Sequence, residues 1–389
     1  MTVQRLRPFS VNVFASMSAL AAHVGAVNLG QGFPDEDGPP AMLEAARQAI
    51  ADGVNQYPPG LGIAELREAI AAQRHRRYGQ EFDPETEVLV TVGASEAIAG
   101  AILGLVEPGS EVLLLEPYFD TYSPVIAMAG AHRVSVPLVP DGRGFALDVD
   151  AVRAAITPRT RAIVVNSPHN PTGMVLSDAE CQALAEIAVE ADLLVISDEV
   201  YERLTFDGRE HLPLASYPGM AERTVTVSSA AKMFNCTGWK IGWACGAPEL
   251  VAGVRAAKQY LSYVGGAPFQ PAVAYALNHE DAWVDGLRDS LQAKRDKLGA
   301  ALTDLGFEVH ASSGTYFLCV DPRPLGFDDG TEFCEQLPQR AGVAAIPMSA
   351  FCDPESTPRA WNHLVRFAFC KRDETLDEAI RRLAVLTPS

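Results

Sequence analysis

Lys232 stands in a short segment whose residue types suit covalent chemistry at an amine. Ser228 and Ser229 precede it, and a second cation, Lys240, follows eight positions later beside a Gly-Trp pair. A lysine becomes a covalent catalyst only when its amine is unprotonated and fixed in place. Small hydroxyl residues and a second cation suit a lysine held next to an anionic cofactor. We therefore expect Lys232 to be catalytic, although an isolated lysine also fits a solvent-exposed cation near a turn.

Two further polar segments contain groups that could bind such a cofactor. Residues 166–173 include Asn170, two prolines that restrict the backbone and Gly173, which permits a tight turn. Alone, this segment also fits an ordinary proline-rich connection. Asp198 stands 28 positions after Asn170, with Tyr201 close behind it. The pair of segments favours a functional site over a plain connection.

Three other segments carry candidate residues whose signals are weaker when each is taken alone. Ala94 and Ser95 precede a helical pattern, where backbone N–H groups could bind an anion, but many turns between a strand and a helix look like this. Tyr118 follows a Glu-Pro pair after a predicted strand and is a candidate for contact with a ligand, but it also fits an ordinary core or surface tyrosine. Arg366 could bind a carboxylate through two parallel N–H donors, and it also fits a surface arginine on a strand.

Short apolar runs followed by alanine-rich stretches position these segments. The apolar runs predict strands and the alanine-rich stretches predict helices, an alternation typical of a parallel α/β sheet. The predicted strands are 88–92, 112–115, 162–165, 193–196 and 224–227, and the predicted helices are 96–105, 178–190 and 249–259. Ligands bind beyond the carboxyl ends of the strands in such sheets. Because a chemically suitable segment follows each predicted strand, we expect one shared site there.

The residues after Trp283 predict a second, smaller α+β domain. A long helical pattern leads to strands expected at 308–310, 315–320 and 364–369, and residues 28–34 are expected to complete this domain. At 389 residues the chain exceeds what one core usually supports. We predict an N-terminal arm with part of the small domain at 1–44, a large domain at 45–285 and a small domain at 286–389.

The composition disfavours several classes of function. A formal net charge of −18 and a pI near 4.9 disfavour non-specific binding to nucleic acid or to anionic membranes. No window of about 18 uninterrupted apolar residues predicts a membrane span. Residues 1–29 do not form a convincing signal peptide. The seven cysteines are scattered without a CxxC pair, which predicts reduced thiols in a cytoplasmic protein and no metal site.

Taken together, these motifs resemble those of the class I pyridoxal-phosphate-dependent aminotransferases of fold type I. The resemblance covers about residues 25–385, with the motifs in the expected order. It implies an α/β fold in which helices flank a mostly parallel central sheet, plus a smaller α+β domain built from both termini. It also implies pyridoxal 5′-phosphate as the cofactor, held through a Schiff base with Lys232, and a homodimer.

The resemblance assigns a role to each cofactor contact. Asp198 corresponds to the carboxylate that keeps the ring nitrogen protonated, which makes the ring an electron sink. Asn170 and Tyr201 match the donors to the phenolate oxygen. The residues that match the phosphate site are Ala94, Ser95, Ser229 and Lys240. The family often has arginine where this chain has Lys240, so a point charge replaces a bidentate fork.

Other roles concern stacking, the partner subunit and the substrate. Tyr118 is expected to stack on the cofactor ring, and Tyr57 to reach the phosphate from the neighbouring subunit of the dimer. Arg366 matches the arginine that binds the substrate carboxylate, with Asn170 beside it. Gly32 lies in a strip that resembles the N-terminal segment closing over the substrate, which would exclude water when the small domain moves.

The implied reaction is transamination, in which an amino acid gives its amino group to a 2-oxo acid, commonly 2-oxoglutarate. Lys232 would move a proton between substrate and cofactor, first as a base and then as an acid. Residues 29–35 and 55–57 are similar to the branch of kynurenine, glutamine and methionine aminotransferases. The chain as a whole is also similar to bacterial N-succinyl-diaminopimelate aminotransferases of lysine biosynthesis. That similarity makes N-succinyl-LL-2,6-diaminopimelate the first choice of amino donor.

Three alternatives stay open at this point. Kynurenine, glutamine or methionine transamination would differ only in the pocket lining, and a cysteine-S-conjugate β-lyase would use the same site for elimination. A non-enzymatic regulator with this fold is disfavoured, because no basic DNA-binding segment precedes residue 25 and the chain is acidic. Between residues 256 and 271 only Lys258 is basic, so no dedicated arginine for a second carboxylate is evident there.

Overall fold

The protein is described from a computed structural model, which covers residues 2–9, 12–142, 144–355 and 361–386. Met1 and residues 387–389 of the predicted terminal domains lie outside it. Its α-helices are α1 (Val13–Val24), α2 (Pro40–Ala51), α3 (Ala64–Tyr78), α4 (Gly93–Leu105), α5 (Tyr122–Met128), α6 (Val149–Ala155), α7 (Asp178–Glu190), α8 (Ala230–Met233), α9 (Pro248–Lys258), α10 (Phe269–His279), α11 (Asp281–Asp304), α12 (Gly330–Ala341) and α13 (Asp373–Leu383). Its strands are β1 (Val27–Asn28), β2 (Val88–Val92), β3 (Glu111–Glu116), β4 (His132–Pro137), β5 (Val139–Asp141), β6 (Gly144–Ala146), β7 (Thr160–Asn166), β8 (Leu194–Asp198), β9 (Thr224–Ser229), β10 (Ile241–Cys245), β11 (Glu308–Val309), β12 (Phe317–Asp321), β13 (Val343–Ala344), β14 (Ile346–Pro347) and β15 (Val365–Ala368).

A seven-stranded sheet forms the centre of the larger part of the molecule. Its strand order is β2-β10-β9-β8-β7-β3-β4. All neighbours pair in parallel except β10, which runs antiparallel to both β2 and β9. The fold is therefore α/β with a mostly parallel sheet, as the sequence predicts. The strand β10 was not predicted; it follows β9 after only the short helix α8 and a 3-10 turn, and runs back beside it.

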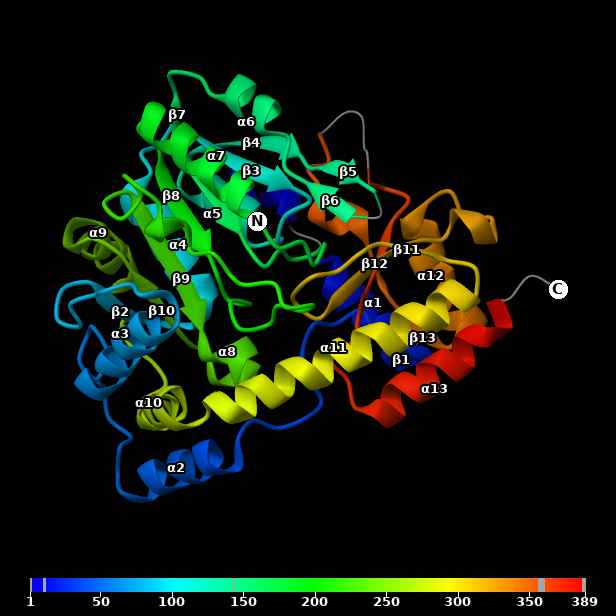
Figure 1. Cartoon of the computed structure of the whole chain (residues 1–389), viewed down its shortest axis with the longest axis horizontal. Coiled ribbons are helices and arrows are strands. Elements are labelled where there is room, and N and C mark those ends of the chain that lie inside the picture. The colour runs from blue at the N-terminus through cyan, green and yellow to red at the C-terminus, as the bar shows by residue number, and fades with distance from the viewer. Residues whose placement is uncertain (1, 10–11, 143, 356–360, 387–389) are drawn as a thin grey trace.

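Both faces of this sheet are covered by helices, which explains why its strands are continuous apolar runs. Along β3, the side chains of Leu113 and Leu115 pack on the same side as α7, whereas those of Val112 and Leu114 pack on the side of α4 and α9. Successive residues of a strand point to opposite faces, so a strand buried on both faces needs apolar residues at consecutive positions. Figure 1 shows the helices in front of and behind the strands.

A smaller four-stranded sheet has the order β11-β12-β15-β14 and is antiparallel. Beside it, β1 from the N-terminal region pairs in parallel with β13. Ala368 N donates to Leu29 O at 2.6 Å, which ties the two chain ends together. The long helix α11 leads from the large sheet to this part of the molecule (Figure 1). The division of the chain at residues 44 and 285 stays a prediction.

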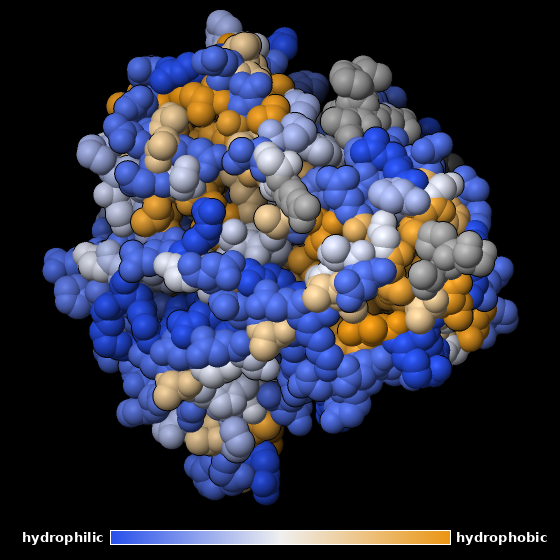
Figure 2. All heavy atoms as spheres, turned by 45° about the vertical axis from the view of Figure 1, so that its right-hand side comes forward, coloured by the Kyte–Doolittle hydropathy of each residue, from blue (hydrophilic) through white to orange (hydrophobic). Residues whose placement is uncertain are grey.

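The surface and the thiols bear on the expectations from composition. Hydrophilic residues cover most of the face seen in Figure 2, and hydrophobic residues show through only in separate places. Within the described residues, no helix has the length and apolar character that crossing a membrane requires. The cysteines at 181, 236, 245, 319, 334 and 370 are buried, and none forms a disulfide with another of the described residues.

Candidate active site

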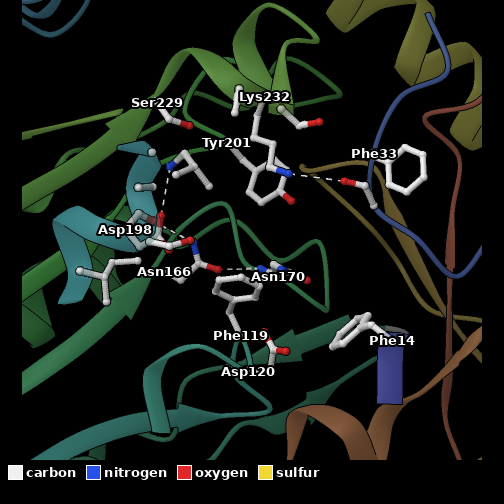
Figure 3. A pocket seen from close by; sticks show the side chains of 18 of the residues that line it. Phe14, Phe33, Phe119, Asp120, Asn166, Asn170, Asp198, Tyr201, Ser229 and Lys232 are labelled. Carbon is white, nitrogen blue, oxygen red and sulfur yellow. Dashed lines mark hydrogen bonds between the residues drawn. The ribbon is translucent and has the colours of Figure 1, made fainter. Parts of the chain in front are cut away.

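A cavity of about 360 Å³ opens at the carboxyl edge of the large sheet, where it meets the smaller sheet. The parallel strands end there, so the segments that follow them face one space. Ten of the sequence-predicted site residues line it: Gly32, Ala94, Ser95, Asn170, Asp198, Tyr201, Ser229, Lys232, Lys240 and Arg366. Figure 3 shows several of them pointing toward one another from different elements. The sequence-predicted Tyr118 and Tyr57 are not among the lining residues.

Lys232 extends into this cavity from the short helix α8, which begins one residue after β9 ends. Its Nζ lies 3.4 Å from the carbonyl oxygen of Gly32, the contact drawn as a dashed line in Figure 3. It also lies 5.8 Å from the ring centre of Tyr201 and 5.5 Å from that of Tyr316. Burial lowers the pKa of the Lys232 amine to about 8. About a tenth of this amine is therefore unprotonated at pH 7, far more than for an ordinary lysine, and nucleophilic chemistry requires the unprotonated form.

Asp198 closes the end of β8 and is almost completely buried. One carboxylate oxygen accepts a hydrogen bond from the Tyr122 hydroxyl at 2.6 Å, and the other accepts from Val200 N at 3.3 Å. Asn166 Nδ2 donates to the Asp198 carbonyl oxygen at 2.8 Å, which fixes the backbone at this position. Burial raises the pKa of Asp198 to about 6, although the Tyr122 hydroxyl opposes the increase. The Asp198 carboxylate is therefore mostly ionised at neutral pH. As a buried anion that lines the cavity, it favours a positively charged group of a ligand beside it.

Asn170 and Tyr201 flank Asp198 on the neighbouring loops. Asn170 N donates to Asn166 Oδ1 at 2.7 Å, and its own Oδ1 accepts from Arg366 Nη1 at 2.8 Å. The amide Nδ2 of Asn170 is thus left to donate toward the cavity. Burial raises the pKa of the Tyr201 hydroxyl above its usual range, so this group keeps its proton and is a hydrogen-bond donor.

An anion-binding corner lies where β2 turns into α4. Gly93 has φ +72°, and a Cβ there would lie 3.1 Å from the Lys240 ammonium group. Ala94 and Ser95 occupy the first helical turn, whose N–H groups have no partner within the helix. Ser229, at the end of β9, and Lys240 line the same cavity. Backbone N–H groups, hydroxyls and an ammonium together suit a phosphate group.

Arg366 reaches the cavity from β15 of the smaller sheet and is buried. Its Nη2 donates to Gly30 O at 2.9 Å, while Nη1 donates to Asn170. Its guanidinium carbon lies 3.8 Å from the ring centre of Phe317 and 4.5 Å from that of Phe351. Burial lowers the pKa of Arg366 to about 10, which leaves it charged at neutral pH. Its Nε is buried without a hydrogen-bond partner in the described residues, so the cation has donor capacity left for a ligand.

Gly32 lies opposite Lys232 in the loop that follows β1. Its carbonyl oxygen also accepts a hydrogen bond from the Tyr316 hydroxyl at 2.5 Å. A Cβ at Gly32 would lie 2.6 Å from the Phe317 ring, closer than real Cβ atoms approach another atom. The backbone can therefore come this near to the aromatic residues only because position 32 has no side chain.

The structure places Tyr118 outside the cavity, and its predicted stacking on the cofactor ring stays a prediction. Its side chain is buried outside the cavity, next to Asp353 and Arg133, and burial raises its pKa to about 12. The following residue, Phe119, lines the cavity instead, and Figure 3 shows its ring beside Asn170. Successive residues after β3 point in opposite directions, and the sequence could not tell which of two adjacent aromatic residues faces inward.

Tyr57 lies outside the cavity and is 82% exposed. Its ring packs against that of Tyr263 with centres 5.6 Å apart, and Tyr260 beside it is also strongly exposed. Tyr57 therefore does not contribute to the cavity of its own chain. Its predicted contact across a subunit interface stays a prediction.

Several cavity or contact residues were missed by sequence reasoning. Asn166 begins the 166–173 segment and lines the cavity, but no role was predicted for it. Tyr122, which holds Asp198, comes from α5 and is distant in sequence, so no local motif identifies it. Asp120 lines the cavity near Arg366, and its position beside the aromatic pair after a strand was the only available signal. Tyr316 precedes β12, and only the contact with Gly32 reveals its place.

Comparison with known proteins agrees with this geometry. A sequence model of the family "Aminotransferase class I and II" matches residues 24–383. A probable N-succinyldiaminopimelate aminotransferase of Mycobacterium tuberculosis is 74% identical over 391 aligned residues, 99% of this chain and 98% of that protein. The methionine aminotransferase of Escherichia coli is 39% identical, covering 98% and 97% of the two chains. The solved structure of the N-succinyldiaminopimelate aminotransferase from Mycobacterium tuberculosis superposes with a TM-score of 0.98 and 75% identity, over 99% of this chain and 100% of that one.

Proposed function

The chain belongs to the class I and II aminotransferases, and from this premise we propose that it transfers the amino group of N-succinyl-LL-2,6-diaminopimelate to 2-oxoglutarate. It is a pyridoxal-phosphate-dependent transaminase, as members of the family are. The observation that carries the choice of substrate is the 74% identity, over nearly the whole of both chains, to the protein of Mycobacterium tuberculosis.

The groups in the cavity fit pyridoxal 5′-phosphate. An amine with a lowered pKa, a buried carboxylate and an anion-binding corner face one space of about 360 Å³. We assign Lys232 to the aldehyde, Asp198 to the ring nitrogen, and Asn170 and Tyr201 to the phenolate oxygen. The bound cofactor supplies an electron sink for the charge that develops at the substrate's Cα. The assignment to the phosphate comprises Ala94, Ser95, Ser229 and Lys240, and Phe119 replaces Tyr118 as the aromatic residue on the ring.

Lys232 is the residue that moves protons. Its unprotonated Nζ accepts the proton from the substrate's Cα, and the resulting ammonium can donate it again. Because burial keeps the pKa of this amine near 8, both directions are accessible at neutral pH. The carbonyl oxygen of Gly32, 3.4 Å from Nζ, holds the amine in its orientation.

Arg366 binds the α-carboxylate of the substrate in this proposal. It is buried and charged, and its Nε has no hydrogen-bond partner in the described part of the chain. Asn170 accepts from Nη1 and holds the guanidinium in the plane that a carboxylate needs. The loop with Gly32 covers the same side of the cavity, so water is displaced where the proton moves.

Within the described residues of this chain, no basic group without an assigned role lines the cavity to bind the distal end of the substrate. Lys232, Lys240 and Arg366 are the basic residues among the described ones that line the cavity, and each already has a role. Lys258, the candidate between residues 256 and 271, is occupied instead, because its Nζ donates to Gly60 O at 3.1 Å and to Tyr263 O.

The test is a panel of amino donors with 2-oxoglutarate as acceptor. We expect kcat/KM to be highest for N-succinyl-LL-2,6-diaminopimelate and at least tenfold lower for glutamine, methionine and kynurenine, a difference of about 1.4 kcal/mol in transition-state binding. Equal activity with the unrelated donors would contradict the choice of substrate. A cysteine conjugate that yields pyruvate and a thiol faster than a full-length oxo acid would favour the β-lyase. Lys232→Ala is the inactive control.

The homodimer and the place of Tyr57 in it are part of the proposal. Tyr57, Tyr260 and Tyr263 expose aromatic surface in neighbouring loops, which supports a covered interface there. Mixing Lys232→Ala with Tyr57→Ala subunits should restore activity that neither variant has alone, because one site of the mixed dimer is intact. No recovery in refolded mixtures would contradict a shared site. The scattered cysteines without a CxxC pair support a cytoplasmic enzyme, which fractionation of cells can check.

A further inference from the structure

A cluster of buried charges lies directly behind Asp198. It consists of Arg74 with Gln80, Glu199, Glu202 and His211, and is called the Arg74 cluster below. The side chains of Arg74, Glu199 and Glu202 have no exposed surface. None of the five residues lines the cavity. The cluster is thus not part of the site described above, yet Glu199 is the next residue after Asp198.

Arg74 reaches across from α3 and is saturated with acceptors. Its Nη1 donates to Glu202 at 2.7 Å, and its Nη2 donates to Glu199 at 2.8 Å. Its Nε donates to Gln80 Oε1 at 2.8 Å. Burial of a charge is costly unless the charge is paired and hydrogen-bonded. The geometry shows that both requirements are met for this guanidinium.

The cluster keeps Glu199 ionised in spite of its burial. Burial alone would raise the pKa of Glu199, but Arg74 and the hydrogen bond with His211 lower it to about 2. The Nε2 of His211 lies 2.9 Å from Glu199 Oε2, the oxygen that also accepts from Arg74 Nη2. Two carboxylates therefore share one guanidinium, and without Arg74 a buried anion would stand next to Asp198.

The same two glutamates hold the strand ends that carry the site. Glu199 N donates to Val227 O at 2.8 Å, and Ser197 Oγ donates to Glu199 Oε1 at 2.8 Å. Ser228 Oγ donates to Glu202 Oε1 at 2.7 Å. Ser229, which lines the cavity, comes directly after Ser228, and Lys232 comes three residues after Ser229. The cluster therefore connects β8, which ends in Asp198, with β9, which leads to the lysine.

We propose that Arg74 is a positioning residue for the reaction, which acts through Glu199 and Glu202 to orient Asp198 and the segment before Lys232 and to offset the negative charge behind Asp198. This inference rests on the proposed function of the site. Asp198 is faced by Tyr122 from α5, by Glu199 next to it in the chain, and by Lys232 and Tyr201. Of these groups, Glu199 is the one whose effect on Asp198 the guanidinium controls.

The test uses the holoenzyme with four variants: Arg74→Met, Arg74→Lys, Glu202→Gln and the double variant Arg74→Met/Glu202→Gln. Four quantities are measured for each: kcat and KM for one donor, the midpoint of the pH titration of the bound cofactor's absorbance, the Kd for pyridoxal 5′-phosphate, and Tm. Arg74→Met should lower kcat about 10- to 100-fold, as loss of an outer partner of a functional group does. It should also shift the midpoint to higher pH, because it removes a cation. KM should change less than kcat, because Arg74 does not touch the substrate.

The charge-balanced and conservative variants separate this role from a structural one. The double variant removes one anion together with the cation, so it should return the midpoint toward the wild-type value, and Arg74→Lys should do so in part. If Arg74→Met fails to fold, Glu202→Gln must shift the midpoint to lower pH, since it removes an anion alone. A lower Tm with kcat and Kd within twofold of wild type and the midpoint within about 0.3 pH unit would overturn the proposal. Wild-type protein without lysine-bound cofactor would instead refute the proposed function.

Discussion

Arg366→Lys tests how the substrate carboxylate is recognised. The variant keeps a positive charge on β15 but replaces a planar fork by a single ammonium group, which cannot span two carboxylate oxygens. In the structure Arg366 already donates to Asn170 at 2.8 Å and to Gly30 at 2.9 Å, so its orientation is fixed before a ligand binds. A lysine would lose at least one charge-assisted hydrogen bond to the substrate, worth about 1.5–3 kcal/mol. This corresponds to a decrease of about 10- to 100-fold in kcat/KM.

The assay compares two amines in single-turnover reactions followed by the absorbance of the bound cofactor. One is the amino acid, and the other is the amine with the same side chain but no α-carboxylate. Arg366→Lys should slow only the reaction of the amino acid by the stated factor. Arg323→Lys is the matched control, because Arg323 lies in the same part of the molecule and pairs with Asp321 outside the cavity. An equal loss for both amines, or none for either, would refute a direct contact between Arg366 and the carboxylate.

Three other changes give distinct expected results. Phe119→Leu should raise the Kd for pyridoxal 5′-phosphate about 2- to 10-fold through loss of an aromatic contact, whereas Tyr118→Phe should leave it within twofold; fluorescence titration of the apoenzyme checks both. Asp198 has a pKa of about 6, above its unfolded value, so its stabilising contribution is complete below about pH 4 and is lost as the pH rises through 6. Urea unfolding of the apoenzyme should show the advantage of wild type over Asp198→Asn shrinking by about 2.4 kcal/mol between pH 4 and 7, and parallel curves would contradict it. Gly32→Ala should lower kcat/KM about tenfold because its Cβ would overlap an aromatic ring, while Gly286→Ala, with no atom within 4 Å, should not.

The sequence predicted the large sheet well because its strands are short, apolar and buried on both faces. The predicted ranges 88–92 and 178–190 coincide with β2 and α7, and the capping box of Ser177 and Glu180 explains the sharp start of that helix. The antiparallel strand β10 was missed. Its residues, Ile241–Cys245, are apolar and buried. They come directly after the segment of Lys232 and Lys240, and no separate pattern in the sequence marks a strand there.

The candidate site was predicted as far as its residues lie in local motifs. Lys232, Asp198 and Asn170 follow directly after strands or in loops of the large sheet, so their spacing indicated a shared edge. Of the aromatic pair after β3, Phe119 and not the predicted Tyr118 lines the cavity, since this depends on which way the backbone turns there. Tyr122 was missed because its hydrogen bond with Asp198 joins residues 76 positions apart. Contacts of this kind follow from packing and not from any local pattern.

The union of the two chain ends beside the cavity has a consequence for the order in which the protein can be completed during synthesis. Arg366 donates to Gly30 across 336 positions, and Lys371 donates to Phe33 across 338. The residues assigned to the cofactor all lie between 93 and 240, apart from the partner's tyrosine. During synthesis, the residues of this chain assigned to the cofactor are therefore made before Arg366 and Lys371, which hold the N-terminal segment in place. The side of the cavity assigned to the substrate carboxylate needs Arg366, so it is the last part of the site that can be completed.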